Sequence, residues 1–233
     1  MTPAHHLDHS TILAHAAGTL DESIALVVAS HLAWCPQCRA AVRAGEALGG
    51  ELMDQLPDQP VSAECRARTM AMLDGATLHR FPAPAVADAA VPGPLARLLP
   101  VANLNDLPWK KKAPGVAMYD VKLSPTAKGQ VKLLRIGPGR AVPEHGHGGD
   151  EVTLILSGAY RDHMGRFGRG DVADLDEDIA HKPIAEAGGD CICLVAIERP
   201  TRFKSIAARL MQLSQVEISI HLIHHAGTLK RQP

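Results

Sequence analysis

Aromatic residues are scarce in this chain. Phe, Trp and Tyr make up 3% of its 233 residues, so the core must be built from Leu, Val, Ile and Ala. Long apolar runs are also missing, because no stretch approaches the roughly 20 residues that cross a bilayer. Residues 1–10 lack the basic-then-apolar pattern of a signal peptide. We therefore expect a cytoplasmic protein with no membrane partner, whose five cysteines are kept reduced.

An excess of charge of one sign is missing as well. The formal net charge is -1, which gives no electrostatic reason to expect direct binding to nucleic acid or to an anionic surface. The run of three lysines at 110–112 is typical of a solvated loop. With 46% hydrophobic and 21% charged residues, the chain has the composition of a soluble protein, and its length suits two domains.

The first third of the chain is helical in pattern. Capping residues and helical periodicity predict helices over about 8–17, 23–34, 38–49 and 62–73. The segment 23–34, "SIALVVASHLAW", is apolar on nearly every side, which is typical of a helix buried on several faces. Because a domain of about 80 residues buries little surface, we expect a partner protein to cover one face, with self-association as the alternative.

The second half has the pattern of a β domain. Short segments rich in Val, Ile and Leu, punctuated by Gly-containing turns, predict strands and a barrel or sandwich. The strand segments are 115–123, 130–136, 151–160 and 191–197. Between the halves, five prolines at 82, 84, 92, 94 and 100 predict a Pro/Ala linker. The predicted fold is therefore multidomain: a helical bundle (1–80), a linker (81–100), a β domain (101–205) and an unassigned tail (206–233).

The stretch "SHLAWCPQCRA" holds the first candidate metal site. If the helix continues, His31, Cys35 and Cys38 lie at i, i+4 and i+7 on one face, and Pro36 would turn Cys38 toward the site. Thiolate sulfur and imidazole nitrogen are the ligands of tetrahedral Zn²⁺. A fourth ligand could come from His5, His6, His9 or Asp8. The alternatives are buried core cysteines and a redox pair, which would need a βαβ context.

This motif, His-x3-Cys-x2-Cys after a histidine-rich segment, resembles the zinc anti-sigma domain. The resemblance implies a small helical bundle that binds an extracytoplasmic-function sigma factor and blocks its access to RNA polymerase. It also implies that the zinc ligands are His6, His31, Cys35 and Cys38. A zinc ion closed by four protein ligands is structural and not catalytic.

A second candidate metal site lies in the β half. His145 and His147 are two residues apart, so on a strand both face the same side, and Glu151 begins the next apolar strand. His181 follows 30 residues later. Three histidines and a carboxylate suit Zn²⁺, Mn²⁺, Fe²⁺ or Ni²⁺. The alternative is a pair of surface histidines in a Gly-rich loop.

The spacing Gly139-x5-His145-x-His147-x3-Glu151-x6-Gly158 resembles the first cupin motif. The segment 168–183 is similar to the second, with His181 as the fourth ligand, although the usual proline and glycine before the histidine and the later asparagine are missing. The resemblance implies a double-stranded antiparallel β-barrel that binds Zn²⁺ or another divalent metal. Cys191 and Cys193 share one strand face, either as core residues or as a reactive or auxiliary-ligand pair.

Together the two halves resemble the ChrR-type anti-sigma factors over about residues 1–205. The resemblance implies a regulator and not an enzyme, whose cupin is needed to release the sigma factor under oxidative, singlet-oxygen-type stress. A small molecule or an oxidant would then be the signal at the cupin. The alternative is a metal-dependent cupin enzyme such as a dioxygenase, with Glu144, Asp150 and Tyr160 as candidate acid/base groups.

Overall fold

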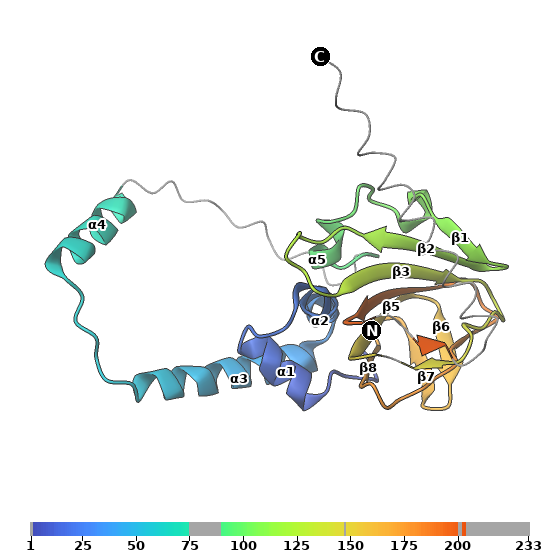
Figure 1. Ribbon diagram of the computed structural model, residues 1–233, viewed down its shortest axis with the longest axis horizontal. Helices are drawn as coiled ribbons and strands as arrows, with labels where there is room; N and C mark the ends of the chain where they lie inside the picture. Colours follow the sequence, from blue (N-terminus) through green and yellow to red (C-terminus); the bar gives the residue numbers. More distant parts are fainter. Residues whose placement is uncertain (1, 75–89, 147, 200–201, 204–233) are drawn as a thin grey trace, which may run out of the picture.

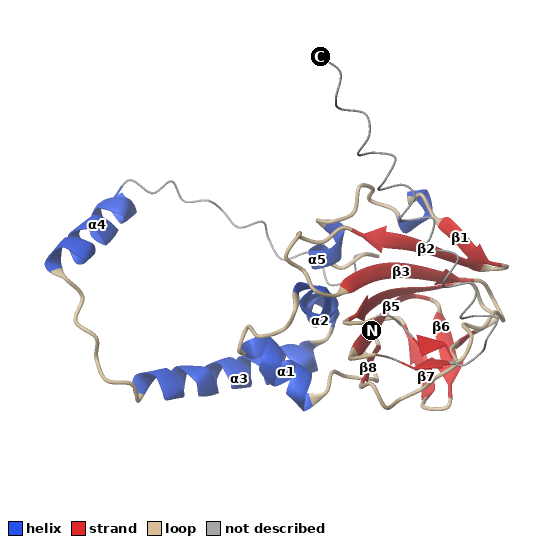
Figure 2. Ribbon diagram, in the orientation of Figure 1, coloured by secondary structure: helices blue, strands red, loops and turns tan. Residues whose placement is uncertain are grey.

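The computed structural model describes residues 2–74, 90–146, 148–199 and 202–203. Helices come first along the chain and strands follow, as Figure 1 and Figure 2 show. The helices are α1 (His9–Ala16), α2 (Glu22–Trp34), α3 (Pro36–Asp54), α4 (Ala63–Asp74), the short α5 (Gly93–Ala96) and the 3-10 turn η1 (Leu104–Asp106). The four helices predicted in the first third are present, with α3 beginning two residues earlier than expected because Pro36 occupies its first turn. The predicted end of this helix at 49 is wrong, because α3 continues through Gly49 and Gly50 to Asp54.

The β domain consists of antiparallel sheets, as predicted. The largest has six strands in the order β1-β2-β3-β10-β5-β8, and it faces a three-stranded sheet β7-β6-β9 and the pair β11-β4. Its strands are β1 (Lys110–Ala113), β2 (Val116–Val121), β3 (Gln130–Ile136), β5 (Glu151–Ser157), β8 (Val172–Leu175) and β10 (Cys191–Ile197). The others are β4 (His145–Gly146), β6 (Ala159–Asp162), β7 (Gly165–Gly168), β9 (Ile184–Ala185) and β11 (Arg202–Phe203).

The central strands β5 and β10 are buried on both faces. Because successive side chains on a strand alternate in direction, Leu154 of β5 and Leu194 of β10 face one side, where they join an apolar cluster with α2. Ile155 and Cys193 face the barrel interior and belong to a second cluster. This explains why both strands are continuous apolar runs in the sequence.

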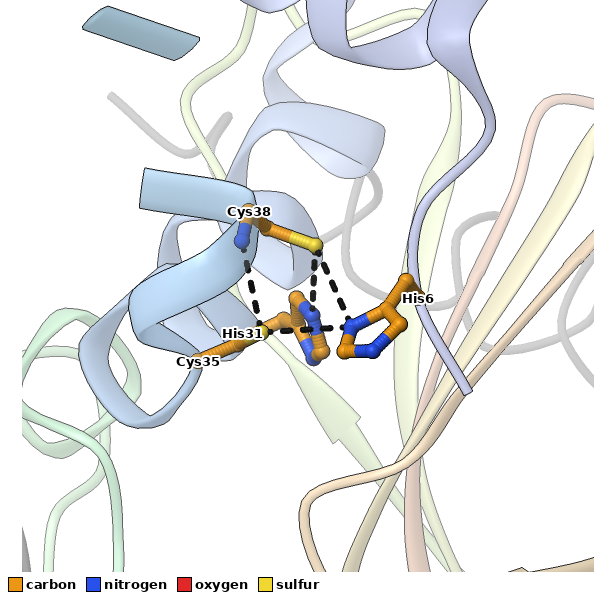
Figure 3. A group of neighbouring side chains, drawn as sticks. All are labelled: His6, His31, Cys35 and Cys38. Atoms are coloured by element: carbon orange, nitrogen blue, oxygen red, sulfur yellow. Dashed lines mark hydrogen bonds between the residues drawn. The ribbon is translucent and has the colours of Figure 1, made fainter. Parts of the chain in front are cut away.

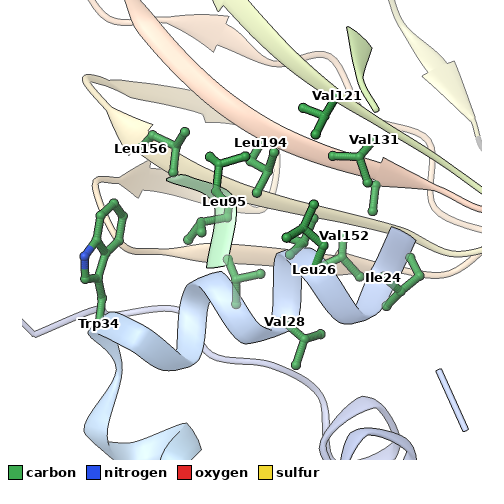
Figure 4. Packing of buried hydrophobic residues seen from close by; sticks show 14 of the residues in the cluster. Ile24, Leu26, Val28, Trp34, Leu95, Val121, Val131, Val152, Leu156 and Leu194 are labelled. Carbon is green, nitrogen blue, oxygen red and sulfur yellow. The ribbon is translucent and has the colours of Figure 1, made fainter. Parts of the chain in front are cut away.

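Helix α2 is covered by the chain's own β domain. It lies against β3, β5 and β10, and Figure 4 shows apolar side chains of the helix and the strands packed between them. Val27 and Val28 are fully buried. The expectation that a partner protein covers this helix is therefore wrong, because the six-stranded sheet takes that place. We call the apolar cluster between α2 and the sheet the shared core.

Two acidic residues at the start of α2 fasten it to the loop between β2 and β3. The Asp21 carboxylate accepts hydrogen bonds from the backbone N–H groups of Lys128 (2.9 Å) and Gly129 (3.1 Å). The Glu22 carboxylate accepts from the backbone N–H and the hydroxyl of Ser124. A Cβ atom at Gly129 would lie 2.2 Å from the Ser23 hydroxyl and 2.8 Å from the backbone carbonyl oxygen of Ile197, so a larger residue would force the loop away from the helix or the strand.

The described part of the predicted linker differs from a simple spacer. Within residues 90–100, α5 packs against α2, and Leu95 is fully buried in the shared core. Pro94 stands in the first turn of α5, where proline costs no backbone hydrogen bond. The predicted tail, 206–233, lies outside the described residues.

Helices α3 and α4 extend away from the β domain (Figure 1). In α3 the buried residues, Cys38 and Val42, are in its first half, and α4 has no buried residue. None of the described helices combines the length and the apolar character needed to cross a bilayer.

Candidate metal centres

The junction between α2 and α3 places the two cysteines. Helix α2 ends at Trp34, Cys35 is extended (φ -99°, ψ 105°), and α3 begins at Pro36. The Cys38 N–H points at the Cys35 sulfur, 3.4 Å away. The predicted interruption of the helix at Pro36, which turns Cys38 toward the site, is therefore confirmed. Since proline cannot donate the backbone hydrogen bond that would continue α2, Cys38 reaches the site from the first turn of a new helix.

Four side chains converge at this junction, as Figure 3 shows. The Nε2 atom of His31 lies 3.3 Å from the Cys38 sulfur, and the Nδ1 atom of His6 lies 3.3 Å from the Cys35 sulfur and 3.7 Å from that of Cys38. One ligand atom from each of the four residues lies within 4.8 Å of the others. His31, Cys35 and Cys38 are buried, and His6 is half-buried.

The surroundings prepare these groups for a metal ion. The His31 Nδ1–H donates to the carbonyl oxygen of Gly170 (3.0 Å), which leaves Nε2 with its lone pair toward the sulfurs. Burial lowers the pKa of His31 to about 4, so the imidazole is neutral. Burial raises the pKa of Cys38 to about 11, and a metal ion would displace that proton. Two sulfurs and two nitrogens in a buried cluster fit Zn²⁺.

The other candidates for the fourth ligand have different roles. The His5 ring stacks on Phe167 with centroids 4.1 Å apart, and its Nε2–H points to the carbonyl oxygen of Arg166. Asp8 caps α1 by accepting a hydrogen bond from the Ser10 N–H. His9 is exposed at the start of α1. The structure therefore brings His6 to the cluster, in agreement with the residue taken from the anti-sigma resemblance.

The second group lies inside the barrel. His145 and His181 face each other across an isolated antiparallel bridge, with their Nε2 atoms 3.2 Å apart. A Glu151 carboxylate oxygen lies 3.6 Å from the His181 Nε2 atom. All three residues are buried, and their ligand atoms lie within 4.8 Å of one another. The remaining predicted ligand, His147, lies outside the described residues.

In both His145 and His181, the Nδ1 atom has a protein partner that orients the ring. The His145 Nδ1–H donates to the carbonyl oxygen of Pro143 (2.8 Å), and His181 Nδ1 lies 3.2 Å from an Asp162 carboxylate oxygen. Although burial opposes it, the carboxylates of Glu151 and Asp162 raise the pKa of His181. Two Nε2 atoms aimed at each other beside a carboxylate fit a divalent cation, and the donor set suits several such metals.

Tyr160 and the cysteine pair line the same interior. Cys191 and Cys193 are buried free thiols with sulfurs 3.6 Å apart. The Tyr160 side chain is 1% exposed and packs with them, and its hydroxyl has no hydrogen-bond partner among the described residues. Burial raises the pKa of Tyr160, so the phenol is neutral at pH 7.

Sequence reasoning missed the residues that support these ligands. Asp162 is the last residue of β6, and no spacing motif connects it to His181. Gly170 is 139 positions from His31, so only the fold brings them together.

Comparisons with known proteins agree with both halves. Residues 100–199 match the family model of the ChrR cupin-like domain. Over 214 residues the chain is 44% identical to the anti-sigma-E factor ChrR of Cereibacter sphaeroides, covering 91% of this chain and 98% of the relative. The chain belongs to the ChrR family of anti-sigma factors.

The structural comparison covers most of this ChrR-family chain. A chain in the crystal structure of Rhodobacter sphaeroides SigE in complex with the anti-sigma ChrR is similar, with a TM-score of 0.72 and 40% identity. The match covers 83% of this chain and 98% of that one. The predicted family, the fold of helical domain plus cupin, and the interpretation as a regulator and not an enzyme are confirmed.

Proposed function

We propose that this protein binds and sequesters an extracytoplasmic-function sigma factor through its helical domain and thereby blocks the sigma factor from RNA polymerase. The observation that carries the proposal is the similarity, along nearly the whole of the relative, to an anti-sigma factor whose structure is known in complex with SigE. The protein would act in the cytoplasm, where its sigma factor and the polymerase are found.

In this proposal His6, His31, Cys35 and Cys38 hold a structural Zn²⁺. The ion would supply four bonds and no open position, as expected from a closed set of protein ligands. The four ligand residues connect the segment before α1, the end of α2 and the start of α3 at one point. The zinc site would thus fix how the helices leave the cupin domain.

The surface for the sigma factor would lie on α3 and α4. Because α2 is covered by the sheet, its apolar face is not available to a partner. Large exposed apolar side chains instead gather on the second half of α3, on the segment after it and on α4. They are Leu48, Leu52, Met53, Leu56, Val61, Met70, Met72 and Leu73. Patches of this kind mark protein interfaces.

The cupin domain would hold Zn²⁺ or another divalent metal through His145, His147, Glu151 and His181, and would be needed for release of the sigma factor. Glu151 lies on β5, whose alternate side chains Val152 and Leu154 pack in the shared core with α2. A small molecule or an oxidant of the singlet-oxygen type that alters this site would act on a strand in direct contact with the helical domain.

The test is co-expression with the extracytoplasmic-function sigma factor encoded beside this protein, followed by affinity capture. We expect the wild type to capture the sigma factor, and Cys35→Ala or His31→Ala to lose both bound zinc and capture. His9→Ala is the matched control, because His9 is exposed at the start of α1 and outside the cluster. His145→Ala and Glu151→Ala should keep capture and weaken release by oxidants. Failure of the wild type to capture any such sigma factor would contradict the proposal.

A further inference from the structure

The turn between β7 and β8, residues 168–171, makes a contact with the zinc-binding region through three successive residues. Arg169 lies over the ring of Trp34 at the end of α2, with its guanidinium carbon 4.7 Å from the ring centroid. Gly170 accepts the hydrogen bond from His31. Asp171 holds the segment that carries His6. We call this segment, residues 3–8, the N-terminal arm.

The side chain of Asp171 is a buried carboxylate, and both of its oxygens accept hydrogen bonds from backbone N–H groups. One oxygen accepts from the N–H groups of Ala4 (2.6 Å) and His5 (3.1 Å), and the other accepts from Gly168 (2.8 Å). Its side chain therefore ties the arm to the turn immediately before His6. Buried charge-assisted hydrogen bonds of this kind are among the stronger ones in proteins.

Gly170 is restricted to glycine by two observations. Its φ of +89° is a conformation that other residues rarely adopt, and a Cβ atom would lie 3.3 Å from Pro3 of the arm. The backbone carbonyl can therefore approach His31 while the arm passes over the same residue. Both histidines of the zinc cluster are thus positioned by one turn of the cupin domain.

The same turn is connected to the cupin metal residues. It leads into β8, where Leu175 pairs with Glu151 of β5. On its other side, Phe167 stacks between His5 of the arm and Tyr160 of the barrel interior, with ring centroids 4.1 Å and 5.1 Å away. A shift of Glu151 or Tyr160 would therefore reach the arm through directly packed groups.

We propose that the 168–171 turn is a positioning element that sets the lifetime of zinc in the helical domain and couples that lifetime to the state of the cupin metal site. The inference rests on the proposed zinc site but adds a route between the two centres. Asp171 acts through His6, and Gly170 acts through His31.

The test measures the rate at which a colorimetric chelator removes zinc from the purified full-length protein without any sigma factor. Outer-shell partners of ligands typically change metal affinity by about 10- to 100-fold. We expect Asp171→Ala to release zinc at least tenfold faster than the wild type, and Asp171→Asn, which keeps one acceptor, to fall between them. Asp190→Asn is the control, because Asp190 pairs with Arg135 away from the arm.

Coupling is tested by combining each variant with His145→Ala, which empties the cupin site. In the wild-type background this change should alter the zinc release rate at least threefold, and in the Asp171→Ala background it should have no further effect. If Asp171→Ala does not fold, the same zinc release rates are compared for Asp171→Asn and Phe167→Leu. Equal release rates in all variants would overturn the inference and leave the anti-sigma proposal standing, whereas a wild type without zinc would overturn the zinc site itself.

Discussion

Asp21 shows how one residue can serve both domains. It caps α2 by accepting from the Ser23 N–H (3.0 Å) and hydroxyl (2.7 Å), and the same carboxylate accepts two backbone N–H groups from the β2–β3 loop. Although burial acts to raise it, these hydrogen bonds hold the pKa of Asp21 well below its ordinary value of 3.8. The charged form is therefore the one that stabilises the fold.

Asp21→Ala should lower the free energy of unfolding by at least about 1 kcal/mol at pH 7, the usual cost of removing an N-cap. Because the folded-state pKa is lowered, the contribution is fully present above the unfolded-state pKa, near 3.8, and is lost as the pH falls below it. Urea denaturation of variant and wild type should show a constant difference from pH 7 to pH 5 and a smaller one at pH 3. Asp58→Ala, at an exposed position, is the control. A difference that grows in acid would contradict this.

The cluster of His6, His31, Cys35 and Cys38 was predictable only where its residues are close in sequence. Local spacing predicts His31, Cys35 and Cys38 as ligands. The structure brings these three side chains together through the break between α2 and α3 at Pro36. His6 could not be separated from His5 by spacing, because its position depends on how Asp171 holds the arm. That contact joins segments 166 residues apart, and no periodicity in the sequence reports it.

At the scale of elements, α4 stands out because it contributes nothing to the core. It has no buried residue, and Met70, Met72 and Leu73 are 54%, 76% and 63% exposed. A helix of 12 residues is marginal in water without tertiary contacts. Its sequence is therefore suited to being stabilised by a partner.

Leu73→Glu should weaken capture of the sigma factor at least tenfold, since binding would bury a charge in an apolar interface. The melting temperature of the free protein should not change, because the side chain is exposed. Isothermal titration calorimetry and a thermal melt check the two statements. Glu64→Gln, on the first turn of the same helix, is the matched control. Unchanged affinity for Leu73→Glu would remove α4 from the interface.

Helices and strands were predicted best where the periodicity of apolar residues agrees with the turn signals that bound the segment. The strands β3 and β10 match the predicted segments, whereas Gly158 divides the segment 151–160 into β5 and the start of β6. The runs in β5 and β10 are continuous because a strand buried on both faces has apolar side chains in both directions. Helix α5 was missed, since proline-rich sequence is the usual sign of a spacer, and nothing local shows that Leu95 would be buried against α2.

At the scale of the whole molecule, the two domains are joined by more than a chain connection. The shared core contains residues of α2, α5 and the six-stranded sheet together. The sequence correctly indicated that α2 is apolar on nearly every side. It did not indicate what covers the helix, because a single sequence cannot distinguish a neighbour within the same chain from a partner protein. The predicted domain boundaries remain a proposal in this respect.

Leu194→Ala should therefore destabilise helices and strands together. Leu194 is fully buried in the shared core, and such truncations cost about 2–5 kcal/mol. In a Trp109→Phe background, Trp34 is the remaining tryptophan and reports on the end of α2, while circular dichroism follows the whole chain. We expect a single transition with coincident midpoints, shifted by the substitution. Separate transitions for the two probes would contradict a shared core.

The contact between His31 and Gly170 also sets an order of events during protein synthesis. Gly170 is made 139 residues after His31, which is about 7–28 s at bacterial rates of translation. During that interval α2 has left the ribosome without the sheet that later covers it, and the arm has no turn to bind. Until residue 171 has been made, the nascent helical domain therefore lacks the cupin contacts that position His6 and His31, and its metal ligands reach their final arrangement only after the cupin domain has followed.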